Sequence, residues 1–134
     1  HAYASQDYIK RRGAPKETAD LEEHRILTFG GPTPAHLLDV HWLTTIGRDA
    51  RHPRPAALTI NNISGLYHAA TRGAGIAVLP DYLVDKDAGL VQVLAQLEAP
   101  ALESYLVYPE ELKNVARVQA FRDFLVSKAQ RWAY

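Results

Sequence analysis

The sequence predicts an α/β fold, a mixed sheet with flanking helices, and two observations support this class. Segments with strand character alternate with helix-like segments along the chain, and one stretch has the order strand, capped helix, buried strand. In that stretch Ile63, Leu66, Tyr67 and Ala70 recur on a single helix face, and the helix ends at Gly73. Helical crossovers of this kind normally join parallel strands in a right-handed βαβ unit.

The composition indicates one ordinary globular domain. The chain has 134 residues, of which 47% are apolar and 22% are charged. Fifteen basic and fifteen acidic residues cancel, so this chain by itself lacks the positive field that nonspecific nucleic-acid binding needs. The absence of cysteine fits a reducing cytoplasm, and no apolar run is long enough to span a membrane. Because the chain begins at His1 and contains no methionine, we expect it to be part of a longer protein.

The N-terminal region is expected to contain a strand and two short helices. Ala2–Ala4 has strand character, and Ser5 can cap a helix that has Asp7 in its first turn. That helix is expected to end at Gly13, just after three basic residues. A second brief helix is expected from a Thr18 cap through Glu23.

The rest of the chain continues the alternation of strands, loops and helices. Residues 44–55 are polar and interrupted by glycine and proline, which predicts an exposed loop. Asn61 or Asn62 is expected to cap the crossover helix. A closing helix is predicted to have its apolar face on Val115, Val118, Phe121 and Leu125. The further expected strands are Arg25–Phe29, Leu37–Leu43, Ala57–Ile60, Gly73–Pro80, Leu90–Leu94 and Ser104–Tyr108.

No pattern in the sequence indicates catalysis, a cofactor or a metal site. His36, Asp39 and His41 are close in sequence, but a zinc site needs three or four converging ligands, and structural roles are the preferred interpretation. Ser64 lacks the glycine two positions earlier that a nucleophile elbow requires. The glycine-rich segment at 72–77 precedes a strand, whereas a dinucleotide-binding loop follows one. We therefore expect no catalytic residues.

Several short motifs are spread over almost the whole chain: Tyr3-Ala4-Ser5, Asp7-Tyr8, Gly13, Pro15, Asp20-Leu21, His24, Asn61-Asn62, RGAGIAVLP at 72–80 and YLVYP at 105–109. Together they resemble the effector-binding domain of LysR-type transcriptional regulators. The resemblance implies a fold similar to type 2 periplasmic binding proteins, with two α/β subdomains and a small effector held between them. It assigns residues 1–95 to the second subdomain and 96–134 to a strand and helix that return to the first.

Five residues are candidates for effector contact: Ser5, Phe29, Gly30, Asn61 and Asn62. Ligands of open α/β sheets bind beyond the carboxyl ends of the strands, and helix N-termini attract anions. Ser5 and the two asparagines are placed at expected helix N-termini, where they could contact an effector or only cap the helices. Phe29 and Gly30 resemble a pocket wall of the family, although Phe29 could equally belong to the core.

The resemblance predicts a cytoplasmic effector-sensing domain rather than an enzyme. The expected effector is a small carboxylate or an aromatic metabolite. DNA contact is expected only through a winged helix-turn-helix that this sequence lacks, and the family resemblance implies homodimers or homotetramers. A solute-binding protein of similar fold, for a small organic acid, is the alternative. Because most of the first subdomain is missing, the chain alone is expected to self-associate.

Overall fold

The computed structural model describes residues 1–31, 41–85, 87–99, 101 and 105–130. The chain divides into two compact units, His1–Ala101 and Leu102–Tyr134. The expected strand residues 37–40 and 104 lie outside the described ranges. None of the helices within these ranges is long and apolar enough to cross a membrane.

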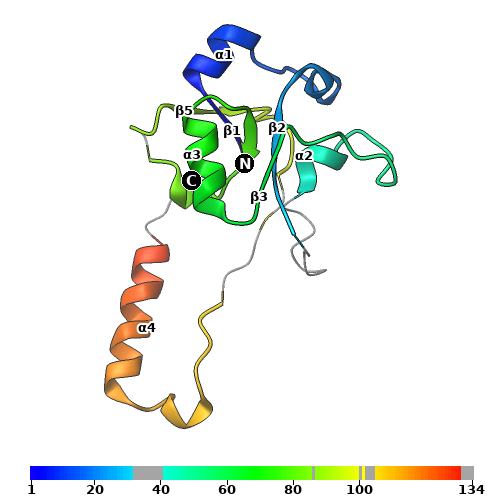
Figure 1. Cartoon of the computed structure of the whole chain (residues 1–134). Coiled ribbons are helices and arrows are strands. Elements are labelled where there is room, and N and C mark those ends of the chain that lie inside the picture. The colour runs from blue at the N-terminus through cyan, green and yellow to red at the C-terminus, as the bar shows by residue number, and fades with distance from the viewer. Residues whose placement is uncertain (32–40, 86, 100, 102–104, 131–134) are drawn as a thin grey trace. The chain divides into compact units, whose positions relative to one another are not determined.

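The first unit is built on a five-stranded mixed sheet with strand order β3-β2-β4-β1-β5 (Figure 1). β2 pairs in parallel with both β3 and β4, while β1 is antiparallel to β4 and β5. β3 and β4 are thus parallel strands on either side of β2, joined through helix α3, which confirms the predicted crossover. The strands are β1 (Ala2–Ser5), β2 (Ile26–Phe29), β3 (Leu58–Ile60), β4 (Ile76–Val78) and β5 (Leu90–Val93).

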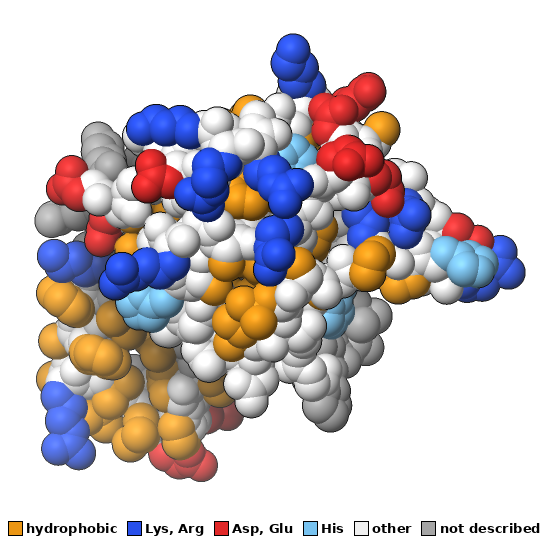
Figure 2. Space-filling view, turned by 45° about the horizontal axis from the view of Figure 1, so that its top comes forward, with side chains coloured by type: hydrophobic (Ala, Val, Ile, Leu, Met, Phe, Trp, Pro, Cys, Tyr) orange, Lys and Arg blue, Asp and Glu red, His pale blue; other side chains and the backbone are white. Residues whose placement is uncertain are grey.

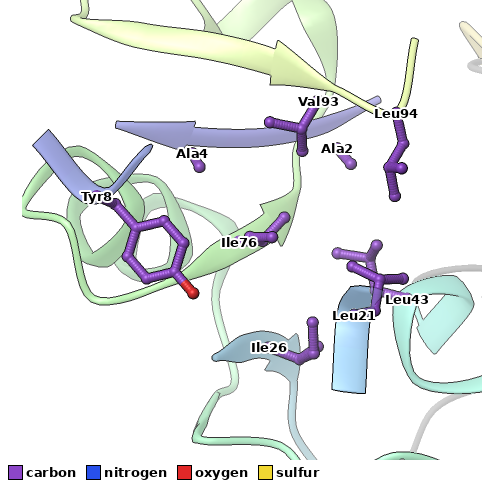
Figure 3. Close-up of a cluster of buried hydrophobic side chains, with 9 residues drawn as sticks. All are labelled: Ala2, Ala4, Tyr8, Leu21, Ile26, Leu43, Ile76, Val93 and Leu94. Atoms are coloured by element: carbon purple, nitrogen blue, oxygen red, sulfur yellow. The ribbon is translucent and has the colours of Figure 1, made fainter. Parts of the chain in front are cut away.

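Helices cover both faces of this sheet, because alternate residues of each strand point to opposite sides. One core cluster, drawn in Figure 3, contains buried residues of α1, of the 3-10 helix η1 and of α2 together with alternate residues of the strands. The other cluster contains Leu66 and Ala70 of α3, packed against Leu27 and Ala77 of the sheet. The helices are α1 (Gln6–Arg12), η1 (Thr18–Glu23), α2 (Trp42–Thr45), α3 (Ile63–Thr71) and the short 3-10 helix η3 (Asp81–Leu83).

Two of the predicted helix caps are confirmed, and a third is displaced. Ser5 Oγ accepts the Tyr8 N–H at 3.1 Å at the start of α1, and Asn62 is the N-cap of α3. The cap of η1 is Glu17 instead of Thr18. The reason is the Asp20 carboxylate, which accepts the Glu17 N–H at 3.1 Å and so begins the helix one residue earlier.

The predicted strand at 37–43 is wrong for its last residues, because Trp42–Thr45 forms the short helix α2. Thr44 Oγ1 donates to His41 O at 2.7 Å, and the Ile46 N–H donates to Trp42 O at 2.8 Å. The helical turn buries Leu43 in the core cluster of Figure 3. Tertiary packing has therefore overridden the strand-like apolar run.

The prediction of an exposed loop at 44–55 is also partly wrong, because Arg54 is buried and only 4% exposed. Its guanidinium donates to Leu43 O at 3.2 Å, to Ile46 O at 2.6 Å and to Thr18 O at 3.0 Å. Glu22 Oε1 lies 2.8 Å from Arg54 Nε as an ion pair, although the N–H is not aligned for a hydrogen bond. Arg54 therefore joins α2 to η1.

The second unit contains the 3-10 helix η4 (Glu110–Leu112) and the helix α4 (Ala116–Ala129), which confirms the predicted closing helix. The expected strand at 104–108 is wrong for residues 105–108, which have no regular secondary structure. A strand needs a hydrogen-bonding neighbour, and the described strands that pair with one another all belong to the first unit. No residue of α4 is fully buried.

Candidate functional site

The parallel strands β2 and β3 end side by side, and we call this end of the sheet the carboxyl edge. Phe29 and Ile60 are paired in the ladder, and the Gly30 N–H donates to Ile60 O at 3.0 Å. Asn61 and Asn62 follow directly after β3. Four of the five predicted contact residues therefore lie together at the carboxyl edge.

The N-terminus of α3 presents unpaired hydrogen-bond donors at this edge. Asn62 Oδ1 accepts the Gly65 N–H at 2.6 Å, which uses one end of the amide for capping. Within the described chain, the backbone N–H groups of Ile63 and Ser64 have no acceptor, and the Asn61 side chain has no hydrogen-bond partner. Both asparagines are exposed. The arrangement can donate several hydrogen bonds to an anion, which the helix dipole also favours.

Phe29 and Gly30 form the neighbouring wall at the end of β2. Phe29 is half-buried and packs against the core cluster on the α3 side of the sheet. Gly30 is buried, and a Cβ at this position would collide with the Thr59 methyl group. Gly30 is thus the residue that lets the end of β2 approach β3 closely.

Ser5 lies at the other end of the sheet and is not brought together with the asparagines. β1 runs antiparallel to β4, so that its last residue is placed at the amino ends of the parallel strands. Ser5 is only 4% exposed, and a Cβ on Gly73, beyond the last turn of α3, would lie 3.2 Å from Ser5 Oγ. Asn62 caps the opposite end of that same helix. The observed role of Ser5 is to cap α1.

Sequence reasoning missed two further pairs of polar residues at the carboxyl edge. Thr28 Oγ1 and His41 Nδ1 lie 3.2 Å apart on the α2 side of β2. Tyr3 Oη donates to Asp81 Oδ1 at 2.8 Å, just beyond the end of β4. The sequence signals were weak: Asp81 follows a strand, and the pattern around His41 raised only the question of a metal ligand. In the described ranges no group of three or more His, Cys, Asp or Glu side chains could hold a metal ion.

A shallow open depression lies away from these residues, beside the start of β2. His24 follows η1 at this depression, and partial burial lowers the pKa of its imidazole, while the Asp20 carboxylate opposes that change. His24 Nδ1 lies 3.0 Å from Tyr8 Oη, which also accepts the Arg25 N–H at 2.9 Å. The contacts fix a helix end and indicate a structural role. The depression is lined by Arg12, Ala14, Lys16, Asp20, Glu23 and His24.

Known proteins with similar sequences and structures are transcriptional regulators. The chain is 28% identical over 130 residues to an HTH-type transcriptional regulator of Xanthomonas campestris, covering 94% of this chain and 38% of that protein. It is 26% identical to the HTH-type transcriptional regulator CrgA of Neisseria meningitidis, covering 93% of this chain and 42% of that protein. The chain thus spans about two fifths of the length of these curated relatives.

The solved structure of the CrgA regulatory domain, a LysR-type transcriptional regulator from Neisseria meningitidis, has the same fold. It matches with a TM-score of 0.68 and 28% identity, covering 95% of this chain and 62% of that one. These matches do not favour the alternative of a solute-binding protein, since the relatives carry the names of regulators. The model of the LysR substrate binding domain matches residues 1–130, and the chain belongs to this family.

Proposed function

We propose that this chain is the effector-sensing part of a cytoplasmic LysR-type DNA-binding transcriptional regulator. Family membership and the names of the relatives support this function. Residues 1–95 would form the second subdomain, and residues 96–134 would form only a part of the first, with its C-terminal helix. DNA would be read by an N-terminal winged helix-turn-helix domain outside this sequence, and the regulator would act as a homodimer or homotetramer. No step of this function requires catalysis by the chain.

The single observation that carries the proposed effector site is the set of open donors at the N-terminus of α3. The Ile63 and Ser64 N–H groups and the Asn61 amide have no partner in the part of the chain that the structure describes. Unpaired backbone donors favour a ligand that brings acceptor oxygens. The proposed site consists of Phe29, Gly30, Asn61 and Asn62, and omits Ser5 because of its place at the opposite edge.

The chemistry of this edge favours a small carboxylate as the effector. A carboxylate can accept hydrogen bonds from two backbone N–H groups and from an asparagine amide at once. The half-buried ring of Phe29 lies beside these donors and can pack against an apolar or aromatic portion of the same molecule. The Asp81 carboxylate follows β4, which is two strands from β3, or about 10 Å at ordinary strand spacing. It is therefore too far from the donors of α3 to accept their hydrogen bonds, and these donors can bind an anionic ligand.

Regulation would follow from a shift between two conformations. An effector that touches both subdomains binds one inter-subdomain geometry better than the other, and this difference in affinity biases the equilibrium. The bias would change the geometry of the oligomer and hence of its DNA-binding domains. A ligand with equal affinity for both geometries would bind without any effect on transcription.

Thermal-shift screening of the full-length protein tests the site, with a panel of organic acids, sugar acids, amino acids and aromatic acids. A ligand that binds only the folded state stabilises it by about 2.7 kcal/mol at 100 times its Kd. In the variant Asn62→Asp the new carboxylate still caps α3 but repels an anionic ligand, so the shift should be lost. The matched variant Asn62→Ser keeps a neutral cap and should retain a measurable shift.

The two variants separate a ligand role from a capping role. Both should melt within a few degrees of the parent protein without ligand, since Asp and Ser are good N-caps. A carboxylate that raises the melting temperature of Asn62→Asp as much as that of the parent would contradict an anion site at α3. A panel in which no carboxylate raises the melting temperature of the parent protein would contradict it as well.

A further inference from the structure

Three arginines belong to segments that meet at the amino edge of the sheet, where the parallel strands begin and α3 ends, and we call them the arginine cluster. Arg11 Nη2 donates to Gly73 O at 3.1 Å, and Arg25 Nε donates to Ala74 O at 2.9 Å. Arg72 is the C-cap residue of α3, immediately before Gly73. The cluster thus combines residues of α1, of the segment just before β2 and of the end of α3.

The backbone around Gly73 is shaped to hold this cluster. Gly73 has a φ of +74°, a left-handed conformation that ends the helix and that glycine adopts without strain. A Cβ at Gly73 would lie 2.8 Å from Arg11 Nη2. The absence of a side chain therefore gives the guanidinium of Arg11 the room to reach the Gly73 carbonyl.

No described carboxylate forms an ion pair with the arginine cluster. The side chains of Arg11, Arg25 and Arg72 are all exposed. Arg11 and Arg25 each use one nitrogen for a backbone carbonyl, while a guanidinium has five N–H donors. Figure 2, in which the α1 side of the molecule comes forward, shows Lys and Arg side chains gathered on this face.

Helix dipoles account for only part of this charge. The C-terminus of a helix carries about half a negative elementary charge, and two helices, α1 and α3, end here. Two such ends offset roughly one of the three positive charges. In the neighbouring depression the charges of Arg12 and Lys16 are balanced by Asp20 and Glu23. A net positive charge therefore remains for a partner.

The surroundings of the cluster restrict the kind of anion that it fits. Asp20 and Glu23 line the same depression as Arg12 and Lys16, so that the positive surface is bordered by carboxylates. The net charge of the whole chain is zero. A nucleic acid, with its long row of phosphates, needs a more extended positive field. A compact group of Asp and Glu side chains on a protein matches a cluster of this size.

We propose that the arginine cluster is a docking surface for an acidic patch on a partner protein. This surface is distinct from the proposed effector site, because Asn62 and Gly73 flank opposite ends of α3. The nine residues of that helix separate the two by roughly 14 Å at 1.5 Å per residue. An effector and a protein partner can therefore occupy the molecule together. The inference does not depend on the effector site.

Fluorescence anisotropy with a labelled peptide of eight glutamates tests the surface, on the full chain without effector. The double variant Arg11→Gln, Arg72→Gln should bind the peptide roughly tenfold more weakly, because two charge-assisted contacts are lost. The control Arg51→Gln removes an exposed arginine that pairs with Asp49, and its affinity should equal that of the parent. Raising the salt concentration should weaken the binding of the parent and the control.

Three results would overturn the proposal. One is equal peptide affinity of the double variant and the control, measured on chains whose thermal unfolding matches the parent. Another is that the parent does not bind the peptide at about 50 mM salt, because charge pairs are only weakly screened at such low ionic strength. The third is that the parent binds a DNA oligonucleotide of the same charge more tightly than the glutamate peptide, and that the double variant loses this DNA binding. Such a result would assign the surface to phosphate groups.

Discussion

Phe29 of β2 and Ile60 of β3 are paired neighbours in a parallel ladder, and this pairing sets the geometry of the carboxyl edge. It places the residue after each strand at the same height, so that the Gly30 N–H donates to Ile60 O at 3.0 Å. The Asn61 side chain begins one residue further on. The proposed effector wall is therefore a consequence of register, since a shift by one residue would turn these side chains to the other face.

Gly30→Ala should disturb this register. The added methyl group would overlap the Thr59 methyl group across the ladder, and overpacking of this kind costs about 1–3 kcal/mol of unfolding free energy. The double variant Gly30→Ala, Thr59→Ser removes the opposing methyl group and should recover most of the loss. Urea unfolding of the single and double variants measures this coupling. Strict additivity of the two substitutions would contradict direct contact between the two side chains.

Arg54→Leu should destabilise the first unit strongly. The substitution leaves the Leu43, Ile46 and Thr18 carbonyls without the Arg54 donors. It also removes one of the two arginines paired with Glu22, which keeps Arg48 at 3.1 Å. Leaving a buried acceptor without its donor costs roughly 1–3 kcal/mol for each group. Urea unfolding of the variant should show a midpoint well below that of the parent, with an unchanged m-value.

Arg51→Leu is the matched control for Arg54→Leu. Arg51 is exposed and pairs with Asp49 in the same loop, and such surface pairs contribute little to stability. Its unfolding midpoint should remain close to that of the parent. If both variants lost the same amount of unfolding free energy, burial of Arg54 would not explain its effect.

The crossover from β3 through α3 to β4 could be predicted because its signals are local. A cap residue marks the start of the helix, the spacing of apolar residues marks its buried face, and a glycine marks its end. All three signals lie within about 20 residues of sequence. The helix α2 could not be predicted in this way. Its last carbonyls are bound by Arg54, eight to eleven residues further along the chain, and such a tertiary contact leaves no periodic signal.

The candidate site shows the same division. Asn61 and Asn62 were predicted at the carboxyl edge because they follow a strand and begin a helix. Ser5 has the same local pattern, a strand followed by a helix, and its cap is confirmed. What the local pattern does not contain is strand direction, and β1 runs antiparallel to β4. The strand-to-helix junction at Ser5 therefore lies at the amino edge of the sheet, opposite to the junction at Asn61 and Asn62.

Stability should fall when His24 becomes protonated. Partial burial lowers the pKa of His24 in the folded chain below its ordinary value of 6.5. Between 6.5 and this lower pKa the unfolded chain binds more protons than the folded chain, so the free energy of unfolding decreases as the pH falls. Above pH 6.5 the contribution is fully present. Melting temperatures measured from about pH 8 to about pH 5 should show this loss.

His24→Gln is the control for the pH dependence. Glutamine offers the Tyr8 hydroxyl a neutral acceptor in place of Nδ1, which lies 3.0 Å from it. The melting temperature of this variant should vary less over the same pH range than that of the parent. The Asp20 carboxylate also has a lowered pKa, because the Lys16 and Glu17 N–H groups donate to it, but its stabilisation is lost only below pH 3.8. An identical pH profile in both proteins would remove His24 from the explanation.

The 134-residue chain by itself should associate with a second copy through its second unit. In the segment before η4, Tyr105 is 76% exposed and Val107 is 84% exposed. In α4, Phe121 is 57% exposed. Both parts of this unit therefore present large apolar side chains to solvent. Apolar surface of this kind is buried in stable soluble assemblies. Light scattering over a concentration series should show a mass above that of one chain. Val107→Asp should shift the chain toward the monomer, whereas Asn114→Asp, in the same unit, should not. A monomer at every concentration would contradict association.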